Sequence, residues 1–411
     1  MTTQTSEAAA RRFGSLLSAG DNMGYRYAVL GAGRQGTACA YDMIRLGQAD
    51  SVLLADQSLA VALAAAARVN GMLNTDQAHP AQLDVTDHAA VVGILTGVDA
   101  FLSAVPYYYN LGIARAAVEA RASMCDLGGN TDLVREQLAL DSAAKAAGIS
   151  IIPDCGQVPG MGTTLMVYAM SLLDEPEEVF MWDGGLPQNP RPPFNYLLTF
   201  NIAGLTNEYN ESPIFLRDGK PTLVPTMDEL EELEFPPPVG RLEAFTTGGG
   251  VSTAPWTFEG KLKTYQNKTV RYPGQFAQLR AFYDLGLWRT DPVPVKGGEV
   301  VPRDLFHALF EPMVTFPGDK DVVVIRIRAT GRKAGRPAEV VLDLMDFFDE
   351  KTGFTAMERT TGWDGAIVAG MMARGQTPRG AVPVELAVPP ELFVEELAKR
   401  GIELKTRVTP L

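Results

Sequence analysis

A glycine-rich segment near the N-terminus contains residues whose types and spacing suit the binding of a dinucleotide. Gly31, Gly33 and Gly36 form the pattern GxGxxG. The first glycine permits a tight turn, the second lets the backbone approach a pyrophosphate, and the third lets a helix lie close to a strand. Free N–H groups at the start of that helix attract phosphate oxygens. The residues predicted to contact the dinucleotide here are Gly31, Gly33, Arg34, Gln35 and Gly36.

An acidic residue after the next strand-like run indicates which dinucleotide is bound. Asp56 ends the apolar run 51–56 and follows Gly36 by 20 residues. A carboxylate at this spacing accepts hydrogen bonds from the adenosine ribose hydroxyls and repels a 2′-phosphate. Arg34 is the alternative signal, because an arginine in the glycine loop can support such a phosphate. The carboxylate predicts NAD rather than NADP as the cofactor.

These motifs require strands and helices in a fixed order, and the chain supplies that order. Strand-forming residues at 25–30 precede the glycine loop, and residues 37–46 carry apolar side chains at helical spacing. The alternation continues with strand-like runs at 51–56, 83–85, 100–105, 123–127 and 149–153 and helical runs at 88–95, 111–120 and 131–147. This pattern predicts an α/β Rossmann domain with a doubly wound parallel sheet.

Ligands of doubly wound sheets bind beyond the carboxyl ends of the strands. The loops 106–110, 128–130 and 154–160 follow strand-like runs, so we expect them to converge near the nicotinamide. Further residues predicted to contact the cofactor are Asp84, Ala104, Val105 and Pro106.

The second half of the chain has a different pattern. Segments separated by Pro- and Gly-rich turns replace the regular alternation, which predicts an α+β domain with a mixed sheet. Small and apolar residues at 361–374 form a helical stretch that can pack tightly. The predicted organisation is a leader at 1–24, an NAD-binding domain at 25–157, a substrate-binding and dimerisation domain at 158–360, and a segment at 361–411 that returns to the first domain.

Composition excludes several classes of function. The net charge is −13 with no basic stripe, which argues against a nucleic-acid partner. No apolar run is long enough to cross a bilayer, so no membrane partner is expected. Three widely spaced cysteines and three histidines indicate neither a disulfide framework nor a metal site. A cytoplasmic location is therefore expected.

Several further motifs occur in a recognisable order. They are LGAGRQG at 30–36, DLGG at 126–129, IIPD at 151–154, VPGM at 158–161, EAF at 243–245, GG at 248–249 with ST at 252–253, and TVRY at 269–272. With these motifs the chain resembles the saccharopine dehydrogenase-like family over residues 25–405, most closely its lysine 6-dehydrogenases. Members often carry a His after the RYxG pattern, where this chain has Gln275.

The resemblance implies a homodimer or higher homo-oligomer that oxidises an amine-bearing carbon with NAD. For the lysine 6-dehydrogenases, the reaction is oxidative deamination of the ε-amino group of L-lysine. The resulting semialdehyde cyclises and ammonia is released. Only the neutral amine readily supplies electrons, so the site needs a base or desolvation to deprotonate an ammonium whose ordinary pKa is about 10.4.

Two acidic positions match the family and follow predicted strands. Asp126 and Asp154 are the candidates for the general base or ammonium anchor, and the alternative is that each caps a glycine-rich loop. Tyr107 is predicted to line the nicotinamide pocket or to hydrogen-bond the amine, and the alternative is packing in the domain cleft. Cys155 has no His nearby in sequence, so we interpret it as a packed cysteine.

The substrate carboxylate is expected to bind in the second domain. Arg271 is the predicted clamp, because arginine makes bidentate contacts with carboxylates, and an interface salt bridge is the alternative. Thr247 and Gly249 belong to a loop that offers hydroxyl and backbone groups, although a glycine-rich hairpin also explains them.

Two other functions remain open. The first is a saccharopine or carboxynorspermidine type reductase that acts on a secondary amine. Such a substrate needs additional Arg or Lys, and the stretch 246–253 contains none. The second is an NAD-binding protein without turnover, because a fold alone does not guarantee chemistry.

Overall fold

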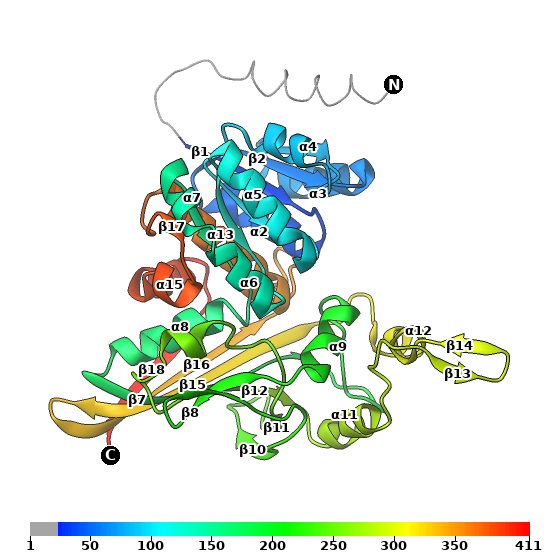
Figure 1. Ribbon diagram of the computed structural model, residues 1–411, viewed down its shortest axis with the longest axis vertical. Coiled ribbons are helices and arrows are strands. Elements are labelled where there is room, and N and C mark those ends of the chain that lie inside the picture. The colour runs from blue at the N-terminus through cyan, green and yellow to red at the C-terminus, as the bar shows by residue number, and fades with distance from the viewer. Residues whose placement is uncertain (1–23) are drawn as a thin grey trace. The chain divides into compact units, whose positions relative to one another are not determined.

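The computed structural model describes residues 24–411, which form two compact units (Figure 1). The first unit comprises the described part of Met1–Met161 together with Glu358–Pro389. The second comprises Gly162–Met357 together with Pro390–Leu411. The predicted leader at 1–24 lies outside the described residues except for Gly24.

A seven-stranded sheet forms the centre of the first unit. Its strands are β1 (Tyr25–Leu30), β2 (Ala49–Asp56), β3 (Ala78–Gln82), β4 (Ala100–Ser103), β5 (Ser123–Asp126), β6 (Ser150–Ile152) and β17 (Gly380–Ala381). All neighbouring strands are parallel, in the order β17-β6-β5-β4-β1-β2-β3. The winding changes direction between β1 and β4, where doubly wound sheets bind their ligands.

Helices connect these strands. They are α2 (Arg34–Arg45), α3 (Leu59–Leu73), α4 (His88–Leu95), α5 (Asn110–Ala120), α6 (Thr131–Leu138), α7 (Asp141–Ala147), α13 (Ala356–Ala373, in this unit from Glu358) and α14 (Val384–Ala387), with a 3-10 turn η1 (Tyr107–Tyr109). The single helix predicted at 131–147 is divided in two. Its break places Asp141 beside β17, where the carboxylate accepts a hydrogen bond from the Ala381 N–H at 3.2 Å.

Helix α13 packs against the helix of the glycine loop. A Cβ on Gly362 would lie 2.6 Å from the carbonyl oxygen of Gln35 and 2.9 Å from the Cβ of Ala38. The indole of Trp363 stacks on the ring of Tyr41, with centroids 6.4 Å apart. The helical stretch predicted at 361–374 therefore begins earlier and contributes directly to the support of α2.

The second unit contains a nine-stranded mixed sheet and a separate hairpin. The strands of the sheet are β7 (Glu175–Pro187), β8 (Ile214–Arg217), β9 (Lys220–Leu223), β10 (Glu231–Glu234), β11 (Arg241–Phe245), β12 (Thr264–Arg271), β15 (Asp321–Lys333), β16 (Arg336–Phe347) and β18 (Leu404–Pro410), and the hairpin is β13 (Val293–Val295) with β14 (Gly298–Val300). Strands β7 and β12 are parallel, whereas the remaining pairs are antiparallel. The predicted fold class, a Rossmann domain followed by an α+β domain with a mixed sheet, is confirmed.

An aromatic cluster forms one core of this unit beside the sheet. Its buried members include Tyr196, Tyr209, Phe245, Trp288, Phe306 and Phe310. The helices of the unit are α8 (Met161–Ser171, in this unit from Gly162), α9 (Ile202–Asn210), α10 (Ala254–Thr257), α11 (Gln275–Asp284), α12 (Pro302–Val314) and α15 (Pro390–Lys399).

The end of the chain divides differently from the predicted segment 361–411. Glu358–Pro389 belongs to the Rossmann unit, but Pro390–Leu411 belongs to the second unit. The reason is strand pairing, because β18 hydrogen-bonds along the outer edge of β16 (Figure 1). None of the helices within residues 24–411 has the length and apolar character needed to span a membrane.

Candidate functional site

The glycine loop of the first unit forms a cradle between β1 and α2. Gly31 has a φ of +97°, and a Cβ there would lie 2.6 Å from the carbonyl oxygen of Ala104 and 3.2 Å from Val105 Cγ1. The space around Gly33 is open, since a Cβ there would meet nothing within 4 Å. Backbone N–H groups at the start of α2 border this space. The cradle therefore fits the pyrophosphate of a dinucleotide.

Asp56 lies at the carboxyl end of β2, beside this cradle. Its Oδ2 accepts a hydrogen bond from the N–H of Ala32 at 3.0 Å, and its Oδ1 accepts one from the N–H of Ser58 at 2.9 Å. These bonds hold the carboxylate next to the glycine loop. Each oxygen can still accept another hydrogen bond from a ribose hydroxyl.

Arg34, the residue that could instead support a phosphate, is held by a carboxylate. Its Nε donates to Oε1 of Glu358 at 2.8 Å. Glu358 is almost fully buried, whereas about half of the Arg34 side chain is exposed. The ion pair offsets the positive charge that Arg34 brings to the loop.

The remaining predicted cofactor residues fall into two groups. Ala104 and Val105 border Gly31, as described above, and Pro106 follows them at the surface. Asp84 lies in an exposed turn after β3, where it accepts hydrogen bonds from the hydroxyl and the N–H of Thr86 at 2.7 and 2.9 Å. These bonds lower the pKa of Asp84. The structure thus groups Ala104 and Val105 with the cradle and places Asp84 in a local turn.

Asp126 is a fully buried carboxylate at the end of β5. It accepts hydrogen bonds from the Gly128 N–H at 2.8 Å, from Nε2 of Gln137 at 2.7 Å and from the Asp154 N–H at 3.3 Å. Burial raises the pKa of Asp126, while these three donors oppose the rise. Such an arrangement holds two loops together at the edge of the sheet. Burial also raises the pKa of the neighbouring Cys155 thiol, in keeping with a packed cysteine.

Asp154 and Tyr107 lie on the loops that Asp126 fixes. Asp154 is 2% exposed and has a φ of +63°, and its carboxylate lies against Gly128. Tyr107 is half-buried and packs on Gly129, where a Cβ would lie 3.0 Å from the Cβ of Tyr107. The three residues predicted for catalysis therefore lie at the carboxyl end of β5 and in the segments that follow β4 and β6.

Arg271, predicted as the substrate clamp, is buried in the second unit. Its Nε donates to the hydroxyl of Tyr209 at 2.7 Å, and its Nη1 donates to the carbonyl of Val270 at 2.9 Å. Its Nη2 lies 3.5 Å from Oε1 of Glu208. The guanidinium also lies 5.5 Å from the ring centres of both Tyr196 and Tyr209. Protein groups therefore surround this guanidinium.

The other two predicted substrate residues lie close to Glu208 on α9. The hydroxyls of Thr247 and Thr269 are 2.7 Å apart, and Thr269 donates to Oε1 of Glu208 at 2.8 Å. The N–H of Gly248 donates to the carbonyl of Glu208 at 2.7 Å. The next residue, Gly249, is exposed. The structure thus brings Arg271, Thr247 and the loop 248–250 together around Glu208, a residue that the sequence analysis missed.

Asp183 and Asn267 complete this cluster, and the sequence analysis missed them too. Nδ2 of Asn267 donates to Oδ1 of Asp183 at 3.3 Å. Burial and the negative charge of Glu208 raise the pKa of Asp183 to about 7. Burial also raises the pKa of Glu208, against the effect of Arg271 and Thr269. One signal was available in the sequence, because Asn267, Thr269 and Arg271 alternate along β12 and so share a face.

Gln275 occupies the position after the RYxG pattern where members of the family often carry a histidine. It is buried at the start of α11. It accepts a hydrogen bond from the N–H of Tyr272 at 2.9 Å and donates to the carbonyl of Phe194 at 2.6 Å. Both ends of the amide are therefore used to join α11 to neighbouring chain segments.

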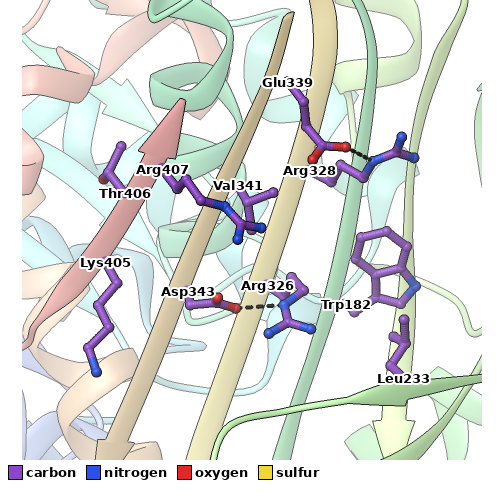
Figure 2. Close-up of a pocket in the computed structure, with 10 residues that line it drawn as sticks. All are labelled: Trp182, Leu233, Arg326, Arg328, Glu339, Val341, Asp343, Lys405, Thr406 and Arg407. Atoms are coloured by element: carbon purple, nitrogen blue, oxygen red, sulfur yellow. Dashed lines mark hydrogen bonds and ion pairs between the residues drawn. The ribbon is translucent and has the colours of Figure 1, made fainter. Parts of the chain in front are cut away.

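The opposite face of the same sheet carries a charged pocket (Figure 2). Trp182 lines this pocket, and it points away from the polar cluster because its neighbour Asp183 lies on the other face. The cavity volume is about 480 Å³. Arg326 pairs with Asp343 at 2.6 Å, and Arg328 pairs with Glu339. The other residues that line the pocket are Leu233, Val341, Lys405, Thr406 and Arg407.

Metal-binding side chains are not grouped anywhere within residues 24–411. No three His, Cys, Asp or Glu side chains there lie close enough to hold an ion. Cys39, Cys125 and Cys155 are buried and form no disulfide within the described residues.

Family models match almost the whole described chain. The model described as the saccharopine dehydrogenase NADP binding domain matches residues 27–152, and the one described as the saccharopine dehydrogenase C-terminal domain matches residues 156–402. The boundary between the matches falls close to that between the two units.

Individual relatives are more distant in sequence. The chain is 24% identical over 238 residues to mitochondrial alpha-aminoadipic semialdehyde synthase of Mus musculus, covering 54% of this chain and 25% of the relative. It is 22% identical over 247 residues to saccharopine dehydrogenase [NADP(+), L-glutamate-forming] of Saccharomyces cerevisiae, covering 57% of this chain and 54% of the relative. The matches thus span about a quarter and about half of these relatives.

Solved structures share the fold over nearly the full chain. Apo saccharopine dehydrogenase (L-Glu forming) from Saccharomyces cerevisiae aligns with a TM-score of 0.75 and 19% identity, covering 94% of this chain and all of that chain. Homospermidine synthase from Legionella pneumophila, solved with NAD, aligns with a TM-score of 0.62 and 11% identity, covering 94% and 91%.

Proposed function

Because this chain belongs to the saccharopine dehydrogenase family, we propose that it is an NAD-linked oxidoreductase that oxidises an amine-bearing carbon of an amino acid. The observation that carries the proposal is the Asp56 carboxylate fixed beside an open glycine cradle. A nicotinamide cofactor bound there would accept the hydride from the substrate carbon. Side chains of the protein would orient the substrate and transfer its protons.

The choice of NAD over NADP rests on charge. A 2′-phosphate next to Asp56 would meet a carboxylate, and the arginine nearest to the cradle, Arg34, is already paired with Glu358. The names of the relatives differ in this respect, since the yeast enzyme is named for NADP and the homospermidine synthase was solved with NAD. The carboxylate supports NAD for this chain.

The proposed substrate is L-lysine, oxidised at the carbon that bears its ε-amino group. Deprotonation of the ammonium comes first, and loss of hydride then leaves an imine that water hydrolyses to the semialdehyde and ammonia. We assign Asp126 a positioning role, because it is buried and already accepts three hydrogen bonds. Asp154 and Tyr107, on the loops it holds, are the groups proposed to act on the amine proton.

A second candidate is a reductase of the saccharopine or carboxynorspermidine type. The family models and the yeast relatives support it, because they are named for saccharopine. A secondary amine with a dicarboxylate arm needs a free cation in its site. Against it, the guanidinium of Arg271 is enclosed by Tyr196, Tyr209 and Glu208.

The decisive experiment measures NADH formation at mildly alkaline pH with L-lysine, saccharopine, ornithine and an amine-free blank. Lysine-dependent turnover with release of ammonia is the expected result. Turnover with saccharopine alone would replace the proposal with the second candidate. Binding of NAD without turnover of any amine would indicate a protein that retains the fold without the chemistry.

We further propose that the protein is a cytoplasmic homodimer. Free cysteines suit a reducing compartment. The charged pocket of Figure 2 supports self-association, because it carries both Arg and Asp or Glu side chains on one sheet face. A two-fold interface needs such a self-complementary surface.

A further inference from the structure

The polar cluster of the second unit carries an excess of negative charge when both of its carboxyl groups are ionised. Glu208 and Asp183 are its two carboxylates. Arg271 is the cation whose positive charge stabilises the ionised form of both. Asp183 is 7% exposed, so solvent does little to screen its charge. One more positive charge would balance the cluster.

Asn267 gives an independent sign of a missing partner. Its side chain is 2% exposed, yet its Oδ1 has no hydrogen-bond partner among the described residues. Its Nδ2 donates to Asp183, which places the unpaired oxygen next to that carboxylate. Leaving a buried acceptor unpaired is unfavourable, because nothing compensates for its loss of hydration. A ligand that donates a hydrogen bond would remove this cost.

Glu208 provides the point of access to the cluster. Its side chain is 23% exposed. Thr269 and Arg271 both act on Oε1, and no residue within 24–411 pairs with Oε2. Beside it, Gly250 abuts the amide of Asn267, where any Cβ would overlap the amide nitrogen. The backbone of Gly250 therefore packs directly on the Asn267 amide, and only glycine fits there.

We propose that Glu208, Asp183 and Asn267 bind an alkylammonium group of the substrate. An ammonium has three N–H donors, and the three side chains supply acceptors for them. The bound ammonium stays protonated, so it is not the amine that is oxidised. For lysine it is the α-ammonium, and the preferred class of substrate is a molecule with two amino groups. This inference rests on the proposed amine oxidation and adds the substrate class to it.

Binding of 1,5-diaminopentane tests the inference directly, with 1,5-pentanediol as the uncharged probe of similar shape. Both are titrated calorimetrically into the full-length protein with NADH present, so that no amine is oxidised. We expect the diamine to bind at least about tenfold more tightly than the diol, as charge-assisted hydrogen bonds predict. Glu208→Gln and Asp183→Asn should each weaken diamine binding by about tenfold or more.

Glu232→Gln is the matched control, since Glu232 is an exposed carboxylate of β10 that pairs with Arg241. It should bind the diamine like the wild type. NADH fluorescence and thermal unfolding identify any variant that has lost its fold, and Asp183→Asn serves if Glu208→Gln does not fold. Wild-type affinity in a folded Glu208→Gln or Asp183→Asn protein, or equal binding of diamine and diol, would overturn the inference.

The outcome is separable from that of the proposed function. If the variants lose diamine binding but the wild type oxidises no amine, the ammonium site stands and the proposed oxidation fails. If lysine is oxidised and both variants keep the wild-type KM for lysine, the oxidation stands and the ammonium site fails.

Discussion

Asp56 combines two roles that substitution can separate. It holds the glycine loop through Ala32 and carries the charge proposed to exclude a 2′-phosphate. We predict that Asp56→Ser lowers the preference for NADH over NADPH by roughly tenfold or more, because hydrogen bonds to a charged group are lost. Fluorescence titration with both reduced cofactors measures this ratio. Asp56→Asn, which keeps an acceptor for the loop, should show a similar change, and an unaltered preference in both variants would remove Asp56 from cofactor selection.

The pKa of Asp183, raised to about 7 by burial and by Glu208, predicts a pH dependence of stability. Asn267 and Arg271 face the same carboxyl and oppose the rise. A carboxyl with a raised pKa binds its proton more tightly in the folded state. Its contribution is therefore greatest near or below its ordinary pKa of 3.8 and is lost as the pH rises to about 7.

Asp183→Asn should remove this pH-dependent contribution to the free energy of unfolding. Urea unfolding of both proteins between pH 4 and pH 8 is the measurement. The free energy of unfolding of the wild type should fall relative to that of the variant up to about pH 7 and then run parallel to it. A difference between the two proteins that is constant over the whole range would show that Asp183 does not titrate as described.

Residues of the cofactor cradle could be predicted because their signals are local. The glycines and Asp56 lie within 26 residues of one another, and their spacing is itself the motif. The environment of Arg271 could not be predicted in the same way. Its partner Tyr209 lies 62 residues earlier in the chain, and Asp183 lies 84 residues before Asn267. Only the folded sheet shows that Arg271 is enclosed and that Glu208 is the accessible group.

Among the elements, the regular alternation of strand-like and helical runs allowed the helices and strands of the Rossmann unit to be predicted. Two features of this unit depend on contacts between distant parts of the chain and could not be predicted. The break between α6 and α7 places Asp141 beside β17, and nothing within 131–147 signals that contact. Strand β17 itself, Gly380–Ala381, is too short to show a period. Likewise, β18 joins β16 through hydrogen bonds along an edge, which sequence patterns do not reveal.

The tight contact of α13 with α2 can be tested by a substitution at Gly362. Gly362→Ala places a methyl group 2.6 Å from the carbonyl of Gln35, so the two helices must separate. We expect a loss of about 1–3 kcal/mol in the free energy of unfolding and weaker NADH binding. Gly71→Ala on α3, where a Cβ meets nothing within 4 Å, is the control and should be neutral or stabilising. Equal stability of both variants would show that this helix contact is not tight.

For the whole molecule, the two proposals assign different kinds of recognition to the two faces of the second sheet. Successive residues of a strand point to opposite sides, so Asp183 belongs to the polar cluster while Trp182 lines the charged pocket. The first face is built of buried polar groups that suit a small ligand. The second carries paired and unpaired charges, as Figure 2 shows, which suits another protein surface. The sheet can therefore support substrate binding and self-association at once.

Substitution of Arg407 on β18 tests the proposed self-association. This residue is exposed and has no ion-pair partner among the described residues, whereas Asp343 and Glu339 lie on the same face. In a two-fold dimer each Arg407 can pair with a carboxylate of the other copy. We predict that Arg407→Glu raises the dissociation constant of the proposed dimer by at least about tenfold, because like charges then face each other. Arg407→Lys keeps the charge and should remain dimeric. Sedimentation equilibrium at fixed salt measures both variants, and a monomeric wild type, or an Arg407→Glu protein that dimerises as tightly as the wild type, would mean that this face does not join two copies.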